Sequence, residues 1–195
     1  MIEGIAEIIV RFSGGFWSWF EITRSCEWRL LQKLYLKIYY LYQKKYCAFI
    51  AHNALFASEP CFPHNLNGIF IAGGAKIGLN CVIFHQVTLG ANSLPFSRTV
   101  GAPTIGDNCY IGAGAMIIGS VTIGSNCRIG ANCVVTTDVP ANCVVVSERC
   151  RIITQDAPMI NRYYRWSPEG PVYFDRGTWI LETDAAIIDN VSKGV

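Results

Sequence analysis

The sequence has little charge and no long apolar run, and each absence excludes a class of protein. Only 15% of the 195 residues are charged and the net charge is +2, which excludes a disordered segment and a nucleic-acid-coating tail. The longest stretch without a charged residue, Ile77 to Ser97, contains His85 and several amide or hydroxyl side chains, so no membrane-spanning helix fits. Glu3 and Glu7 stand where a cleavable signal peptide carries positive charge. We therefore expect a cytoplasmic protein with no nucleic-acid partner.

Metal-binding cysteine pairs are also absent, although the chain contains nine cysteines. No two of them form a C-x-x-C pair, and the closest, Cys127 and Cys133, are six residues apart. Small buried thiols in a reducing compartment are the expected state of these residues. The sequence therefore predicts neither a disulfide framework nor a metal site.

A period of six residues organises the middle of the chain. Branched aliphatic residues recur at this interval, with one interruption, at Ile71, Ile77, Ile83, Leu89, Ile105, Ile111, Ile117, Ile123, Ile129 and Val135. Small residues stand four positions after most of them, at Ala75, Cys81, Val87, Cys109, Ala115, Val121, Cys127, Cys133 and Val139. Glycine often follows the aliphatic residue directly, as at Gly78, Gly90, Gly106, Gly112, Gly124 and Gly130. Neither a helix nor an ordinary strand has this period.

Such a period is typical of a parallel β-helix, in which three short strands close a triangular coil of about 18 residues. The aliphatic side chains are expected to point inward and to stack from coil to coil. The glycines are expected to adopt turn conformations with positive φ, which other residues resist. The predicted fold class is mainly β, with helical and extended segments at the two ends.

The period is interrupted twice, and both interruptions predict segments that leave the coil. About ten residues, around Asn92 to Gly101, are extra between Leu89 and Ile105. A shorter bulge is expected from Pro63 to Gly68. Functional sites are often carried by loops on a rigid scaffold, so we expect the site at these breaks.

The segments outside the repeats give three predicted domains, at 1–48, 49–154 and 155–195. Residues 16–46 are aromatic and basic, and apolar positions at helical spacing predict an amphipathic helix from Arg24 to Lys45, begun by Ser25 or Thr23. We expect it to pack on the β-helix or on a neighbouring subunit, or to contact a membrane surface or a glycolipid. The alternating pattern from Arg165 to Leu181 predicts a terminal hairpin or extended arm.

The three histidines of the chain, His52, His64 and His85, lie in or beside the first two predicted coils. His64 falls in the short bulge and His85 lies shortly before the long loop. An imidazole on a bulge can face a groove, and its ordinary pKa of about 6.5 suits a general base at neutral pH. His64 and His85 are therefore the candidate catalytic residues.

The repeat region resembles the hexapeptide-repeat acyltransferases, and within them the serine acetyltransferases and the enzymes that acetylate sugars and capsule polysaccharides. The motifs that carry the resemblance are H-N-L-N-G-I-F-I from His64, V-T-L-G before the long loop, G-A-P-T-I-G-D-N-C-Y-I-G-A-G-A from Gly101, and I-G-A-N-C-V-V-T-T-D-V-P from Ile129. They lie between Ile50 and Ile153, slightly more than half of the chain.

The resemblance implies a left-handed coil, a homotrimer, and acetyl-CoA bound as co-substrate in the groove between neighbouring subunits. His64 matches the catalytic histidine of the family, while His85 is expected to act mainly in acceptor binding. Cofactor-binding residues carried over from the family are Gly90, Ala113 and Ala131, whose backbones line the CoA arm, and Arg128, where the family has a lysine near the phosphates.

The chain departs from the serine acetyltransferase pattern at the acceptor site. Phe49 stands where the family has the carboxylate that orients the catalytic histidine, and Glu59 is a possible substitute. Pro63 replaces an aspartate, and Gly101 and Ala102 replace an Arg-His pair. Because buried ionic groups without partners are costly, we expect free serine to be a poor acceptor.

The sequence therefore predicts an acetyl-CoA-dependent O-acetyltransferase that modifies a hydroxyl of a sugar or polysaccharide precursor. Serine O-acetylation is the alternative within the same class. A zinc lyase resembling the hexapeptide carbonic anhydrases is a further alternative, although its ligand spacing is missing among the three histidines. A non-catalytic scaffold is the last alternative, and absence of CoA binding would favour it.

Overall fold

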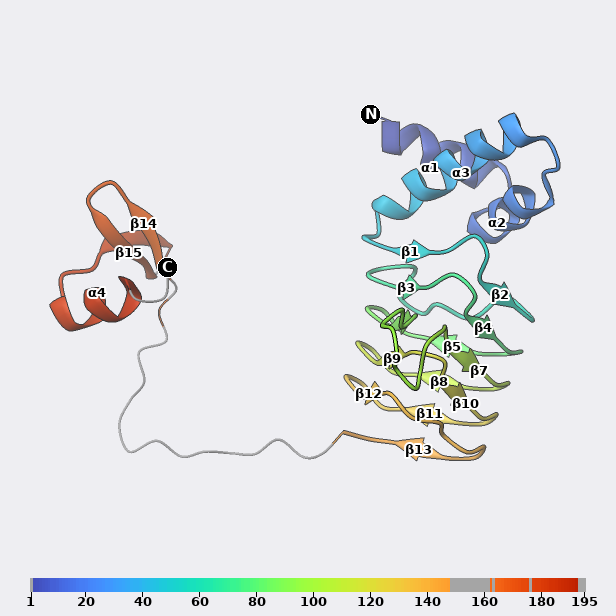
Figure 1. Cartoon of the computed structure of the whole chain (residues 1–195). Coiled ribbons are helices and arrows are strands. Elements are labelled where there is room, and N and C mark those ends of the chain that lie inside the picture. Colours follow the sequence, from blue (N-terminus) through green and yellow to red (C-terminus); the bar gives the residue numbers. More distant parts are fainter. Residues whose placement is uncertain (1, 148–161, 163, 176, 193–195) are drawn as a thin grey trace. The chain divides into compact units, whose positions relative to one another are not determined.

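The computed structural model describes all residues except 1, 148–161, 163, 176 and 193–195 (Figure 1). Compact units lie within Met1–Arg149 and within Cys150–Val195. The predicted boundary between residues 154 and 155 falls outside the described residues.

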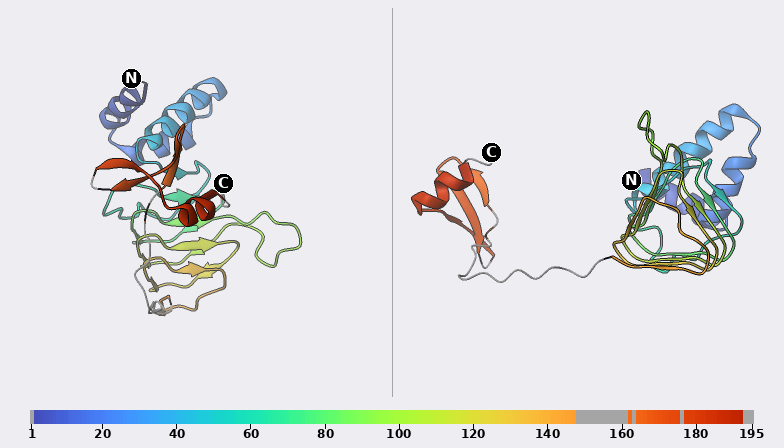
Figure 2. Two further views of the ribbon diagram at one scale, coloured as in Figure 1. Left: turned by 90° about the vertical axis from the view of Figure 1, so that its left-hand side faces the viewer. Right: turned by 60° about the horizontal axis from the view of Figure 1, so that its bottom comes forward.

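The first unit contains a parallel β-helix whose short strands stack into three sheets (Figures 1 and 2). The first sheet contains β1 (Phe49–Ile50), β3 (Phe70–Ile71), β6 (Thr88–Gly90), β9 (Met116–Ile118) and β12 (Val134–Val135). The second contains β2 (Leu55–Phe56), β4 (Lys76–Ile77), β7 (Thr104–Ile105) and β10 (Thr122–Ile123). The third contains β5 (Val82–Ile83), β8 (Tyr110–Ile111), β11 (Arg128–Ile129) and β13 (Val144–Val145). The chain passes through the sheets in this order from β3 to β12, and isolated bridges at Cys61 and Val139 continue the order in the first and last coils, so the predicted fold is confirmed.

The core of the β-helix consists of the predicted aliphatic column. All ten periodic aliphatic residues are at most 4% exposed. Beside them, the Cys81 thiol donates to the carbonyl of Gly106 at 3.2 Å, and the Cys127 thiol to that of Pro140 at 3.0 Å. A hydrogen bond with Cys81, together with burial, raises the pKa of the Cys109 thiol above its ordinary value. The cysteines of the described residues are all free, so these thiols fill space in the core.

The prediction that the glycines directly after the periodic aliphatic residues have positive φ is wrong. Between the second and third sheets, positive φ occurs instead at Asn108 (54°), Asn126 (62°) and Asn142 (62°). Their amides form a ladder, with Asn108 donating to Asn126 at 3.3 Å and Asn126 donating to Asn142 at 3.0 Å. Gly106 is needed for close approach, because a Cβ there would lie 2.6 Å from the backbone nitrogen of Ser125 in the next coil.

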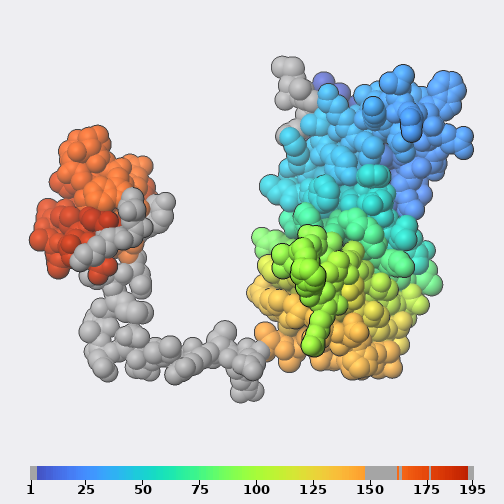
Figure 3. Space-filling model, viewed as in Figure 1, coloured from blue at the N-terminus to red at the C-terminus, as the bar shows by residue number. Residues whose placement is uncertain are grey.

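Both predicted breaks leave the coil without disturbing the register of the strands. Ile50 pairs with Ile71 across the bulge, and Leu89 pairs with Ile117 across the long loop. The bulge joins the third sheet to the first, whereas the long loop joins β6 to β7 and stands out from the surface (Figures 2 and 3).

Helices cover the N-terminal end of the coil: α1 (Ile2–Phe12), α2 (Phe16–Ser25) and α3 (Arg29–Lys44) (Figure 1). The predicted single helix from Arg24 to Lys45 is wrong, because the chain is extended at Cys26 and α3 begins only at Arg29. Neither proposed cap begins α3, and the Thr23 hydroxyl instead donates to the carbonyl of Trp19 at 2.7 Å.

Tyr39 and Gln43 attach α3 to the first coil. The Tyr39 hydroxyl donates to the carbonyl of Ile50 at 2.9 Å, and the Gln43 side chain accepts a hydrogen bond from the Ile50 backbone nitrogen. The helix therefore packs on the β-helix, which was one of the alternatives expected from the sequence. Trp28, just before this helix, and Leu34 on it remain exposed, so contact of residues 16–46 with a membrane surface or glycolipid stays a prediction. Among the described helices, none is long and apolar enough to span a membrane.

The second unit is a small antiparallel sheet with one helix. It contains β14 (Tyr164–Ser167), β15 (Gly170–Asp175), β16 (Thr178–Leu181) and α4 (Ala185–Ser192). The hairpin predicted around residues 168–170 is confirmed by the pairing of β14 with β15. Buried Glu182 accepts hydrogen bonds from Arg162 at 2.8 Å and from the Tyr164 hydroxyl at 2.7 Å.

Candidate functional site

The bulge that carries His64 is held in place by a side chain buried in the core and by a hydrogen bond to the next coil. Leu66 is only 5% exposed and anchors the bulge in the core. The Asn67 side chain donates to the carbonyl of His64 at 2.8 Å, and the Asn67 carbonyl accepts from the backbone nitrogen of Gln86 at 2.9 Å. Since Gln86 follows His85, the backbone of His64 is connected to the turn that carries the second histidine.

The two candidate catalytic histidines lie against each other. The ring centroids of His64 and His85 are 4.9 Å apart with an interplanar angle of 87°. His64 is exposed, whereas His85 is half-buried and its Nδ1 atom has no hydrogen-bond partner among the described residues. Phe84 contacts the other side of the pair, 5.6 Å from the His64 ring. The structure thus brings both predicted residues together with one ring free to meet a ligand.

A groove of about 380 Å³ lies on the outer face of the third sheet, and Phe84, which contacts His64, is one of its lining residues. Phe84 is 4.9 Å from Tyr110 between ring centroids, and both line the groove. The remaining lining residues are Gly112, Ala113, Arg128, Ile129, Gly130, Ala131 and Val144. Three of the four predicted cofactor-binding residues therefore share one groove.

Gly90 is the predicted cofactor-binding residue that the single chain does not bring to the groove. It ends β6 at the base of the long loop, whereas His85 stands before the start of the same strand. A Cβ at Gly90 would lie 2.8 Å from the Ile118 side chain, so the position is tightly packed.

No carboxylate orients His64 in the described part of the chain. Phe49 stacks between Tyr40 and Phe70, at 5.5 and 5.2 Å, on the outer face of the first sheet. Glu59 lines a separate pocket and forms no hydrogen bond with His64. The contacts that hold His64 in place come instead from Asn67 and the neighbouring rings.

The residues that the sequence reasoning missed have a weak signal in the repeat itself. Tyr110, which was missed, is the strand partner of the predicted Arg128 in the pairing of β8 with β11, and both stand at the outward position of their strands. The six-residue period also gives the outward positions of one sheet, so Tyr110 could have been predicted from it. Phe84 could have been predicted from its place immediately before His85. The role of Asn67 depends on a turn geometry that the period does not encode.

The zinc alternative finds no ligand set in the described residues, where no group of three His, Cys, Asp or Glu side chains is placed to hold a metal ion. His52 is engaged elsewhere, with its Nδ1 atom 3.0 Å from the Tyr40 hydroxyl.

The long loop is internally ordered around Asn92. The Asn92 side chain donates to the hydroxyl of Ser97 at 2.7 Å and to that of Thr99 at 3.2 Å, and its backbone pairs with Gly101. Phe96, at the tip, is fully exposed and has a φ of 63°. The loop therefore holds a large apolar ring out into solvent.

Comparison with known proteins identifies the repeats. Residues 102–137 match the family model described as Bacterial transferase hexapeptide (six repeats). A serine acetyltransferase of Mycobacterium tuberculosis is 38% identical over 110 residues, which are 56% of this chain and 44% of that protein. Serine acetyltransferase 5 of Arabidopsis thaliana is 46% identical over 88 residues, covering 44% of this chain and 27% of that protein. The chain thus spans less than half the length of these curated relatives.

Solved structures give the same result for the fold. The serine acetyltransferase of Neisseria gonorrhoeae in complex with serine has a TM-score of 0.59 and 28% identity, over 70% of this chain and 55% of that chain. Serine acetyltransferase isoform 3 of Entamoeba histolytica in complex with cysteine has a TM-score of 0.55 and 33% identity, over 64% and 44% of the two chains. The resemblance to hexapeptide-repeat acyltransferases and the left-handed β-helix with N-terminal helices are confirmed.

These relatives overturn the predicted sugar or polysaccharide acceptor and favour the alternative reading. The prediction depended on the missing polar side chains at Pro63, Gly101 and Ala102. Gly101 has a structural task in this chain, because its backbone closes the loop against Asn92, and Ala102 packs against the core. Gly101 and Ala102 therefore lack polar side chains because of their roles in loop closure and packing. Their lack of polar side chains does not identify the acceptor.

Proposed function

We propose that this chain catalyses transfer of an acetyl group from acetyl-CoA to the hydroxyl of serine. The observation that carries the proposal is the His64–His85 pair, which contacts Phe84 in the wall of the groove that contains Arg128, on a repeat domain similar to serine acetyltransferases. Because the chain covers less than half of the Mycobacterium relative, activity, substrate and assembly are all proposals for this chain.

In the proposed reaction, His64 acts as the general base. Its exposed imidazole takes the proton of the serine hydroxyl while the oxygen attacks the thioester carbonyl carbon. The tetrahedral intermediate then collapses, the carbon–sulfur bond breaks, and the CoA thiolate receives the proton from His64. O-acetylserine and free CoA are the products, and no metal is required for the proton balance.

The groove beside Arg128 is suited to the CoA arm. Gly112, Ala113, Gly130 and Ala131 have no bulky side chains, so an extended pantetheine arm can lie close to their backbone. The Arg128 guanidinium, exposed on β11, provides a charge for the CoA phosphates.

We propose that the complete site is shared between subunits of a homotrimer. The outer face of the first sheet is apolar, with Phe49, Phe70, Met116 and Val134 between 39% and 66% exposed. Heterologous association that closes into a ring of three would cover such a face. In this arrangement the loop tip at Phe96, and Gly90 at its base, complete the groove of the neighbouring subunit.

The charged ends of serine need partners that differ from the family pattern. Arg98 lies on the ordered loop, is exposed, and forms no ion pair within the described residues. We propose that it binds the serine carboxylate, which a bidentate guanidinium is well suited to do.

Release of CoA tests the proposed function. The purified protein is mixed with acetyl-CoA and a thiol-detecting dye, and L-serine is titrated. We expect saturable, serine-dependent thiol release. L-Alanine is the matched control, since it has the same charged ends and no hydroxyl. If serine and alanine give the same rate, the proposal is wrong.

Arg128→Glu should raise the KM for acetyl-CoA by about tenfold to a hundredfold, because a charge-assisted contact is lost and repulsion replaces it. The fold should be unaffected, since Arg128 points outward and its neighbours Cys127 and Ile129 carry the packing. Steady-state kinetics with acetyl-CoA as the varied substrate provide the measurement. Lys76→Glu makes the same charge change on the outer face of the second sheet and should leave KM unchanged. Equal effects of the two variants would remove Arg128 from the CoA site.

A further inference from the structure

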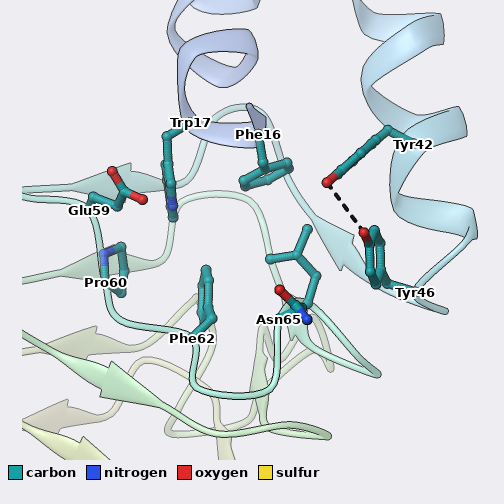
Figure 4. Close-up of a pocket in the computed structure, with 9 residues that line it drawn as sticks. Phe16, Trp17, Tyr42, Tyr46, Glu59, Pro60, Phe62 and Asn65 are labelled. Carbon is teal, nitrogen blue, oxygen red and sulfur yellow. Dashed lines mark hydrogen bonds between the residues drawn. The ribbon is translucent and has the colours of Figure 1, made fainter. Parts of the chain in front are cut away.

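A second cavity lies between the N-terminal helices and the first coil, apart from the groove described above. It measures about 200 Å³ and is lined by α2, the end of α3 and the chain around the bulge. Its lining residues are Phe16, Trp17, Tyr42, Tyr46, Glu59, Pro60, Phe62, Asn65 and Leu66 (Figure 4). Neither His64 nor Arg128 belongs to this lining, so the cavity is distinct from the acetyl-transfer groove.

Five of the nine residues that line this cavity are aromatic. Trp17 stacks on Phe62 with ring centroids 5.9 Å apart, and Phe16 stacks on Tyr42 at 6.0 Å. Tyr42 donates a hydrogen bond to the hydroxyl of Tyr46 at 3.5 Å. Burial raises the pKa of Tyr42 above its ordinary value, so this phenol is neutral at physiological pH. The ring faces thus supply negative electrostatic potential without a formal charge.

Glu59 provides the formal charge of the cavity. Its exposed carboxylate lies beside Trp17 and Pro60 (Figure 4), and it forms no hydrogen bond or ion pair with any described residue. A neighbouring hollow on the Trp17 side is also lined by Glu59 and adds Glu21. The exposed Glu21 carboxylate has a long ion pair with Arg24, at 4.0 Å. Two carboxylates, one of them without a partner in the described residues, therefore lie beside the half-buried indole of Trp17.

We propose that this cavity binds a small organic cation of the ammonium class, with Glu59 opposite its charge and the aromatic rings around its alkyl groups. Aromatic walls with a carboxylate recognise ammonium ions by cation–π attraction and charge pairing. A neutral ligand of the same shape would gain only the apolar contacts. An anion would be repelled by Glu59.

The cavity is also in contact with the catalytic bulge, because Asn65 and Leu66 follow His64 directly and line the cavity. An occupant would touch the segment that positions His64. The proposal concerns binding and does not depend on serine acetylation, since occupancy can be measured without turnover.

Choline and 3,3-dimethyl-1-butanol form a matched pair of probes, because they have the same shape and differ in the positive charge. Each is titrated into the full chain without acetyl-CoA, and binding is followed by ligand-observed saturation-transfer NMR of its equivalent methyl protons. We expect saturable binding of choline, with the neutral alcohol weaker by about tenfold. Equal binding of the two probes, or no saturable binding of choline, would overturn the proposal.

Two charge-removing variants localise the binding. Glu59→Gln should weaken choline binding by about fivefold to tenfold, since it removes the charge and keeps the shape. Glu27→Gln removes an exposed carboxylate between α2 and α3 that lines neither hollow, and it should leave choline binding unchanged. If Glu59→Gln has no greater effect than Glu27→Gln, the cation does not bind in this cavity. Thiol release from acetyl-CoA with serine is measured on the same samples, so loss of choline binding can be distinguished from loss of acetyl transfer.

Discussion

Replacing His64 by alanine is expected to lower kcat for serine acetylation by about 10²- to 10⁴-fold, the usual contribution of a general base. The KM for acetyl-CoA should change little, because the groove residues around Arg128 do not include His64. The fold should also persist, since His64 is exposed and the bulge is anchored by Leu66 and Asn67. Thiol release at saturating acetyl-CoA and serine gives the measurement.

The other two histidines provide internal controls for this result. His85→Ala removes the ring that contacts His64 at 4.9 Å, and we expect a smaller loss that appears mainly in the KM for serine. His52→Ala removes the contacts with the hydroxyl and ring of Tyr40 and should leave kcat unchanged. Full activity of the His64→Ala protein would exclude His64 as the base and point to His85.

Replacing Gly106 by alanine is expected to destabilise the first unit by about 3 kcal/mol, the upper part of the range for overpacked sites. The added methyl group would lie 2.6 Å from the Ser125 nitrogen and 2.9 Å from the Gly124 carbonyl carbon. Both are backbone atoms of the next coil, which is held by its own strand hydrogen bonds. A thermal scan should show Tm lower by about 6–12 °C for a unit of this size.

Gly4→Ala is the matched control for Gly106→Ala. Gly4 lies in α1, and a Cβ there would have no atom within 4 Å. The substitution is expected to be neutral or to stabilise the helix by at most about 1 kcal/mol, since alanine has the higher helix propensity. If both alanine variants melt alike, close approach of the coils is not the reason for Gly106.

The six-residue period was sufficient to predict the buried residues of the β-helix and the two places where the chain leaves the coil. An inward side chain is needed once in every strand, so Ile111 and Ile117 could be assigned to the core from spacing alone. The same spacing located the two breaks, because extra residues between Leu89 and Ile105 have no place in a closed coil. His64 and His85 were found since both lie at or beside those breaks.

Features that depend on contacts between turns were not predictable in this way. The period gave no reason to expect asparagine at positive φ, or Asn67 as the residue that joins the bulge to Gln86. The single N-terminal helix was misread because the helical spacing of apolar residues does not report the extended backbone at Cys26 that separates α2 from α3. The acceptor was misjudged from the lack of polar side chains at Gly101, whose backbone closes the loop, and at Ala102, which packs against the core.

The two ends of the coil stack differ, and this difference sets the order in which the protein opens. Backbone amides of the first coil are satisfied by α3 through Tyr39 and Gln43, whereas β13 pairs, among the described strands, with β11 alone. In a linear array, each repeat is stabilised by its neighbours, so local unfolding starts where one neighbour is missing. Amide hydrogen exchange should therefore be slowest around the histidine pair and faster toward β13. Arg128 on β11 belongs to the faster-exchanging end, so a ligand that spans the groove would slow exchange most in the coils furthest from the reacting atoms.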